Sequence, residues 1–217
     1  MKSLIHRIKD PVSCLTHMAG FFLSILGLYL LLMAGNGPLE AISFAVFGTT
    51  MMLMYSASTV YHMFSLSERG TNILRKIDHI MIYLFIAGSF TPFTLLLMDG
   101  ALKWTVISVI WGIAFLGIMF KLLWLHAPRW VSLAFYLGMG WLGLIVLPYT
   151  IMELPAPAAW WVIAGGLSYT IGAVVYGIQK PNPSPEWFGF HEIWHLFVMG
   201  GSFCHFWAIF NYLPDYS

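Results

Sequence analysis

The fold is best recognised from residues 21–28, which read Phe21-Phe22-Leu23-Ser24-Ile25-Leu26-Gly27-Leu28. This stretch is apolar on every face, whereas strands of an outer-membrane β-barrel alternate apolar and polar residues, so it predicts a helix. The whole chain is similar: 59% of its 217 residues are hydrophobic and 9% are charged. Soluble domains have roughly 45–50% apolar and about 25% charged residues. The composition therefore excludes soluble, disordered and collagen-like proteins and predicts a multi-pass membrane protein.

Seven charge-free runs are long enough to cross about 30 Å of hydrocarbon at about 1.5 Å per residue. Cutting the sequence at charges and at glycine, proline and asparagine clusters gives runs at about 14–35, 40–64, 77–98, 102–122, 130–149, 157–178 and 188–212. The connections are short and leave no room for a second folded domain. We therefore expect one all-α domain over residues 1–217, a bundle of seven transmembrane helices. The two cysteines, Cys14 and Cys204, require no disulfide framework.

Lysine and arginine are distributed unevenly between the two ends of the predicted helices. Only Lys103 lies at one end. The residues at the other end are Lys2, Arg7, Lys9, Arg69, Arg75, Lys76, Lys121, Arg129 and Lys180. The positive-inside rule then predicts a cytoplasmic N-terminus and an extracytoplasmic C-terminus in the plasma membrane. A net charge of +1 without a basic cluster along the sequence makes nucleic acid an unexpected partner. Membrane lipids are the expected partners, and the sequence indicates no particular protein partner.

Ionisable groups inside the predicted spans are informative, because each is costly in hydrocarbon unless it is paired, bound to a metal or hydrated. The set comprises Asp78, Glu192, His17, His62, His79, His191, His195 and His205. A helix rises about 1.5 Å per residue, so the depth of a residue follows from its distance in sequence to the nearest cytoplasmic charge. On that scale one shared layer on the cytoplasmic side contains His17, His62, Asp78, His191 and His195. His205 is nearly three helical turns beyond His195 and cannot share this layer.

The chemistry of this layer is that of a metal site. His191 and His195 are four residues apart, so both imidazoles project from one helix face and can bind one ion. His62, from a neighbouring helix, would complete three nitrogen ligands and leave a fourth position for water, as in catalytic zinc sites. Asp78 could act as a general base, and Ser58 lies one turn before His62 on the same helix face. The sequence thus predicts zinc ligands at His62, His191 and His195, with Asp78 and Ser58 as catalytic candidates.

Other roles stay open for the remaining polar groups. The histidine pair also satisfies the HExxH pattern of zinc proteases, in which Glu192 would activate water. Glu192 could instead face the membrane interface or pair with a basic residue such as Lys180. His79 and His205 are expected to form hydrogen bonds between helices, the usual role of a lone membrane histidine. His17 is open between that role and a part in the metal layer.

Several motifs resemble those of the progestin and adiponectin receptor superfamily. In order they are Ser58-Thr59-Val60-Tyr61-His62, Lys76-Ile77-Asp78-His79-Ile80, Gly88-Ser89-Phe90-Thr91-Pro92, His191-Glu192-Ile193-Trp194-His195 and His205-Phe206. The short chain is similar to the bacterial branch, the hemolysin III family, and the resemblance spans essentially all seven helices. Near the N-terminus the family tends to carry glutamate, asparagine and a Thr-His pair. Here Asp10, Ser13 and Thr16-His17 stand in those places.

The resemblance implies a seven-helix fold with the N-terminus inside and a zinc ion near the cytoplasmic leaflet. It assigns zinc ligation to His62, His191 and His195, and contact with water to Asp78. It also relates the chain to membrane hydrolases that include alkaline ceramidases, so the implied reaction is attack of a zinc-activated water on a lipid amide. The bacterial branch is associated with haemolysis and with membrane-fluidity homeostasis.

Three functions follow as hypotheses. The first is a zinc-dependent intramembrane hydrolase of a lipid amide or ester. The second is a non-enzymatic sensor or regulator of the membrane, in which structural zinc links two helices. The third, less favoured, is a pore-forming haemolysin, because an aqueous pore needs polar side chains along its whole length and the outer halves of these spans are almost purely apolar.

Overall fold

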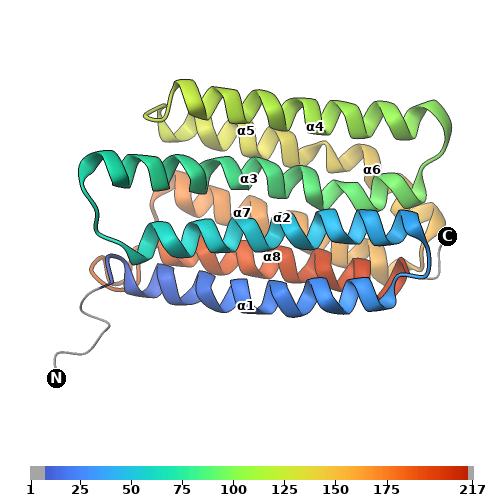
Figure 1. Cartoon of the computed structure of the whole chain (residues 1–217), viewed down its shortest axis with the longest axis horizontal. Coiled ribbons are helices and arrows are strands. Elements are labelled where there is room, and N and C mark those ends of the chain that lie inside the picture. Colours follow the sequence, from blue (N-terminus) through green and yellow to red (C-terminus); the bar gives the residue numbers. More distant parts are fainter. Residues whose placement is uncertain (1–7, 215–217) are drawn as a thin grey trace.

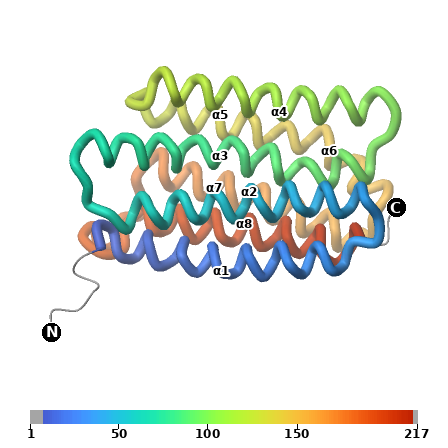
Figure 2. Tube along the Cα trace, viewed as in Figure 1, coloured from blue at the N-terminus to red at the C-terminus, as the bar shows by residue number. Residues whose placement is uncertain are grey.

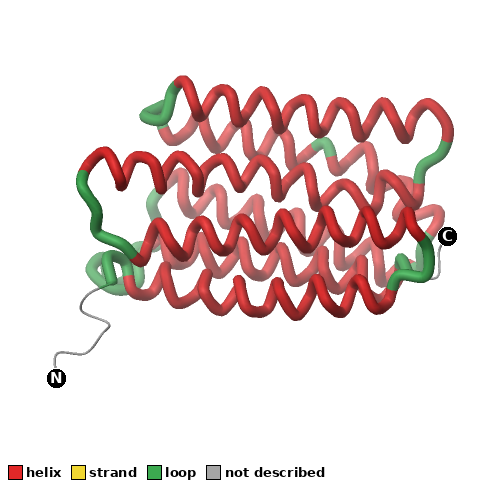
Figure 3. The backbone as a smooth tube through the Cα atoms, viewed as in Figure 1, coloured by secondary structure: helices red, strands yellow, loops and turns green. Residues whose placement is uncertain are grey.

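A computed structural model of the protein describes residues 8–214, and the chain there folds into a bundle of helices whose connecting loops lie mostly at its two ends (Figure 3). The helices are α1 (Pro11–Ala34), α2 (Pro38–Met63), α3 (Glu68–Leu97), α4 (Gly100–Leu123), α5 (Arg129–Trp141), α6 (Gly143–Glu153), α7 (Ala156–Ile178) and α8 (Phe190–Tyr212). Pro11 and Pro38 occupy first helical positions, where the missing N–H of proline costs nothing.

Seven segments of the described chain are long and apolar enough to cross a membrane. Six of them are single helices, and the remaining one, the fifth along the chain, is formed by α5 and α6 together. The break between these two helices falls at Leu142, between Gly140 and Gly143, and glycine has a low helix propensity. The predicted all-α bundle with seven membrane-length segments is confirmed.

Two segments differ more than the others from the expected bounds. Helix α3 begins at Glu68 instead of residue 77, and the side chain of Ser67 caps it by accepting a hydrogen bond from the Gly70 N–H at 3.3 Å. The fifth segment continues past residue 149 to Glu153. Cutting the sequence at charges located the apolar runs, whereas the hydrogen-bonded helices extend into polar flanking residues.

The bundle has a central helix and lipid-accessible outer helices (Figure 1). In α3, 61% of the most apolar window is buried inside the protein, compared with 28% in both α1 and α4. Large apolar side chains of the outer helices are exposed, including Phe22, Leu116 and Leu144. Such exposure is expected of a surface that faces hydrocarbon rather than water. The tube trace shows α1 and α8, the first and last helices, side by side (Figure 2).

The two ends of the described chain lie at opposite ends of the bundle (Figure 1). The bundle end where α1 begins also holds the end of α2, the starts of α3 and α5, the ends of α4 and α7, and the start of α8. It therefore collects the basic residues that the sequence analysis assigned to one side, apart from Lys2 and Arg7, which lie outside the described residues. Lys103, in the first turn of α4, lies at the other end.

Candidate metal centre

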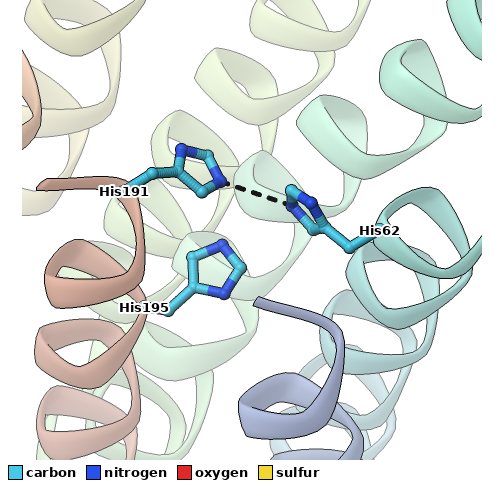
Figure 4. Close-up of side chains that lie close together, drawn as sticks. All are labelled: His62, His191 and His195. Carbon is cyan, nitrogen blue, oxygen red and sulfur yellow. Dashed lines mark hydrogen bonds between the residues drawn. The ribbon is translucent and has the colours of Figure 1, made fainter. Parts of the chain in front are cut away.

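Three histidines from two helices converge at the end of the bundle where α1 begins (Figure 4). His62 lies in the last turn of α2, and His191 and His195 lie in the first turns of α8. Each offers a ring nitrogen, and these three nitrogens all lie within 4.8 Å of one another. The Nε2 atoms of His62 and His191 are 3.3 Å apart. The predicted triad is thus brought together as a group that could hold a metal ion.

The donor set fits a zinc ion. Two nitrogen ligands at about 2.0–2.1 Å from a tetrahedral zinc are themselves about 3.3–3.4 Å apart, which matches the His62–His191 separation. His195 is fully buried, and neither of its ring nitrogens has a hydrogen-bond partner in the described part of the protein. An unpartnered buried polar atom is costly, and ligation of a metal would remove that cost.

Asp10 orients one of the three imidazoles. Its Oδ2 atom lies 2.9 Å from Nδ1 of His62, and Lys9 pairs with the same carboxylate at 3.3 Å. The backbone N–H of Asp10 also donates to the His62 carbonyl at 3.0 Å, which joins the start of α1 to the end of α2. With Nδ1 held by the carboxylate, Nε2 of His62 is left with its lone pair toward the other two histidines.

The charge on Asp10 is favoured by these neighbours. Partial burial raises the pKa of its carboxyl, but the hydrogen bond with His62 and the charge of Lys9 outweigh it, so the pKa lies below its ordinary value. Asp10 is therefore ionised at neutral pH. A carboxylate behind a ligating histidine raises the basicity of that ligand.

Asp78 and Ser58 lie beside the triad and are both buried. Asp78 projects from α3 with 7% exposure and Ser58 from α2 with 2%. Asp78 is close enough to Ser58 and His62 to interact electrostatically with both. The cluster of possible ligand atoms that all lie within 4.8 Å of one another consists of the three histidines. Asp78 is not part of this cluster. Its position suits contact through a water molecule better than direct ligation.

His17 belongs to the same layer, although sequence reasoning left its role open. Its ring stacks on that of His195, with centroids 3.6 Å apart, and meets the edge of Tyr55. Both of its ring nitrogens are buried without a hydrogen-bond partner among the described residues. His17 therefore covers one side of the triad and fixes the plane of the His195 ring.

Glu192 has a structural role at the start of α8. One carboxylate oxygen accepts from the Ser13 hydroxyl at 2.7 Å, and the other accepts from the backbone N–H of Gly189 at 2.8 Å. The second bond is half of a capping box for α8. Because both oxygens are engaged, the geometry favours an anchoring role over the water-activating role of the HExxH pattern. The side-chain hydrogen-bond partner of Glu192 is Ser13 and not Lys180.

The other two membrane histidines lie apart from the triad. Nε2 of His205 lies 3.4 Å from the Val162 carbonyl of α7, the helix-to-helix contact expected of it. His79 lines a separate cavity, and its Nδ1 atom is buried without a partner in the described residues. The contacts of Asp10 and Ser13 were not predicted from the sequence. Their spacing with His17, three and then four residues, is the spacing of one helix face, with Asp10 just before α1, and it could have revealed them.

Comparisons with known proteins agree over nearly the whole chain. The family model described as Haemolysin-III related matches residues 5–206. The chain is 36% identical to the hemolysin-3 homolog of Bacillus subtilis, over 94% of this chain and 95% of the relative. It is 33% identical to hemolysin-3 of Bacillus cereus, over 100% of this chain and 98% of that relative. It is also 30% identical to the human monocyte to macrophage differentiation factor, over 94% of this chain and 84% of that relative.

These matches extend across the helices that supply the histidine triad, and they accompany seven membrane-length segments. The protein is a multi-pass membrane protein, for which the plasma membrane is the natural location in a bacterium. The chain belongs to the hemolysin III family, the bacterial branch of the progestin and adiponectin receptor superfamily.

Proposed function

We propose that the protein is a zinc-dependent hydrolase of lipid amides, with the zinc ion held by His62, His191 and His195. The observation that supports this most is the convergence of three imidazoles, one of them buried without any other partner for its nitrogens. Zinc with three protein ligands and an open position polarises a carbonyl and lowers the pKa of a water molecule to about 7.

The residues beside the triad have the chemistry that hydrolysis needs. The Asp78 carboxylate would take a proton from the water that attacks the amide carbon and return it to the departing amine nitrogen. Ser58, next to Asp78, would hold this carboxylate in place through its hydroxyl. Asp10 would fix the ring of His62, and His17 would keep bulk water from one side of the triad.

An acyl chain has a suitable path next to the triad. An apolar groove of about 240 Å³ lies between α1, α2 and α8, and its lining includes Gly20, Tyr55, Met199 and Phe206. Tyr55 also contacts His17, so the groove begins beside the histidine layer. The hydrocarbon tail of a ceramide could lie in this groove with its amide toward the triad. Membrane lipids would then be the partners of the protein, and nucleic acid would not.

The direction of the chain in the membrane is part of the proposal. The concentration of lysine and arginine at the end where α1 begins favours a cytoplasmic N-terminus and an extracytoplasmic C-terminus. The triad would then lie near the cytoplasmic face. Labelling of single cysteines introduced into the α6–α7 and α7–α8 loops of a cysteine-free variant would test this, with a membrane-impermeant reagent.

The decisive activity test uses purified protein with a panel of ceramides and phospholipids. We expect release of fatty acid that stops on chelation of the metal and returns with added zinc. Asp78→Asn should retain zinc and lose release by about 100-fold or more, as expected when a general base is removed. Asp99→Asn, at the other end of the bundle, is the matched control and should behave as the parent. No metal-dependent release across the panel would overturn the hydrolase proposal.

A non-enzymatic regulator with structural zinc is the second candidate. It is favoured by the fact that the triad joins the end of α2 to the start of α8, so that a bound ion would link two helices. In that case Asp78→Ala would leave both zinc binding and the cellular phenotype unchanged, whereas His191→Ala would destabilise the fold. A phenotype lost in Asp78→Ala with zinc retained would favour the hydrolase.

A further inference from the structure

A second polar site lies close to the histidine triad. It is a cavity of about 210 Å³ between α3, α4, α5, α7 and α8. Three cationic side chains line it, from three different helices: Arg75 of α3, Lys121 of α4 and Arg129 of α5. No carboxylate lines this cavity, and within residues 8–214 none of the three cations forms an ion pair.

Lys121 is the residue that distinguishes this cavity from an ordinary positive membrane surface. A lysine near a helix end usually extends its ammonium group to the interface, but Lys121 is only 1% exposed. Its Nζ atom donates a hydrogen bond to the Ser132 hydroxyl at 2.5 Å. A buried ammonium with one neutral partner is costly without a counter-charge. The lining of the cavity contains no carboxylate, although Asp78 lies close enough to Arg75 to interact with it electrostatically.

The remaining polar groups of the cavity also suit an anion. The Arg129 guanidinium lies over the ring of Tyr176, 4.9 Å from its centroid, and is held in place at the exposed side of the cavity. Arg75 is partly buried and lines the cavity. Nδ1 of His79 is buried and unpartnered. The Arg129 guanidinium also donates to the Gln179 side-chain oxygen, so it is partly satisfied within the protein. The Lys121 ammonium is the least satisfied donor, with the Ser132 hydroxyl as its hydrogen-bond acceptor.

We propose that this cavity binds a phosphate group, in the form of the headgroup of an anionic lipid. Three cations exceed what a single carboxylate would neutralise, whereas a phosphate monoester carries about −1.5 to −2 charges and three acceptor oxygens. Basic pockets between transmembrane helices on the cytoplasmic side are suited to phosphorylated lipid headgroups. Free inorganic phosphate has the same chemistry and is the alternative source.

The site shares a wall with the metal centre. Tyr176 and Trp194 both line the cavity, and the ring of each also contacts the ring of His191, with centroids 5.5 Å apart in both cases. A bound phosphate would therefore be one aromatic side chain away from the triad. The proposal stands on the cavity and its cations and does not depend on the hydrolase activity.

The test uses the full chain in phosphatidylcholine nanodiscs, with and without phosphatidic acid, and measures the thermal unfolding midpoint. Phosphatidic acid should raise the midpoint of the parent protein as its fraction increases. Lys121→Met should weaken this response by about tenfold or more in apparent affinity, as expected when a charged hydrogen bond is lost. Lys180→Met removes the same charge from an exposed position at the same bundle end, outside the cavity, and should respond as the parent does.

Each outcome decides the proposal. A response to inorganic phosphate in pure phosphatidylcholine nanodiscs, lost in Lys121→Met, would support a phosphate site that is supplied from solution. If neither probe stabilises the parent, or if Lys121→Met and Lys180→Met respond equally, the site is refuted. The unfolding midpoint in phosphatidylcholine alone shows whether Lys121→Met folds. If it does not, Arg75→Gln replaces it in the same comparison.

Discussion

The hydrogen bond between Asp10 and His62 gives the sharpest prediction about the metal centre. We expect Asp10→Ala to lower zinc affinity, because nothing would then hold Nδ1 of His62, which is 2.9 Å from the carboxylate. Loss of such a partner behind a ligating histidine typically costs about 10–100-fold in affinity. The Asp10 side chain is 39% exposed and also pairs with Lys9, so we expect the lower end of this range, about tenfold, or about 1.4 kcal/mol.

A conservative variant refines the prediction. Asp10→Asn keeps an acceptor for the histidine and removes the charge, and a neutral hydrogen bond has about half the strength of a charged one. We therefore expect a loss of about threefold. The helix should tolerate both changes, because the Asp10 side chain forms no capping bond with α1. Its backbone hydrogen bond to the His62 carbonyl is unaffected.

Competition of the purified protein with a chromophoric zinc chelator at neutral pH measures both affinities. Asp99→Ala is the control, because Asp99 pairs with Lys103 at the opposite end of the bundle, at 3.6 Å. Its affinity should equal that of the parent. Unchanged affinity in Asp10→Ala would refute the idea that this carboxylate orients a zinc ligand.

Three further predictions follow. Zinc occupancy should fall as the pH drops below about 6, because ligation needs neutral imidazoles and free histidine has a pKa of about 6.5. Asp10, whose pKa is lowered, would still be ionised in that range. Unchanged zinc occupancy at about pH 5 would contradict the prediction. Gly117→Ala should lower the unfolding midpoint by the equivalent of about 1–2 kcal/mol, because its methyl group would overlap the buried ring of Tyr83. Gly112→Ala in the same helix meets no atom within 4 Å and should be neutral or stabilising; equal midpoints would contradict the packing. Glu192→Gln should keep any hydrolysis but lower the free energy of unfolding by about 1 kcal/mol. Loss of turnover in a folded Glu192→Gln protein would instead indicate that Glu192 activates water, as in the HExxH pattern.

The seven segments and the histidine triad could be predicted because both depend on local patterns. Segment positions follow from hydropathy along the chain. The triad follows from a spacing of four residues on α8 combined with the depth of His62 below the same membrane face. Depth is a single coordinate that the sequence supplies well, since the rise per residue of a helix is fixed.

Contacts that depend on the choice of neighbouring helix could not be predicted in the same way. The Ser13–Glu192 hydrogen bond requires α1 to lie against α8, the two ends of the sequence. The cavity lined by Arg75, Lys121 and Arg129 appears as scattered positive charges in the sequence, and becomes a cluster only when α3, α4 and α5 pack together. Lateral packing of membrane helices depends on side-chain fit rather than on hydropathy.

The metal content of the purified protein and its histidine variants tests the metal centre most directly. We expect one zinc ion per chain in the parent and in His205→Ala, whose histidine lies outside the triad. Zinc should be absent or greatly reduced in His62→Ala, His191→Ala and His195→Ala. Parent protein that binds no divalent metal, or folded triad variants that all retain full occupancy, would contradict a site formed by these three imidazoles.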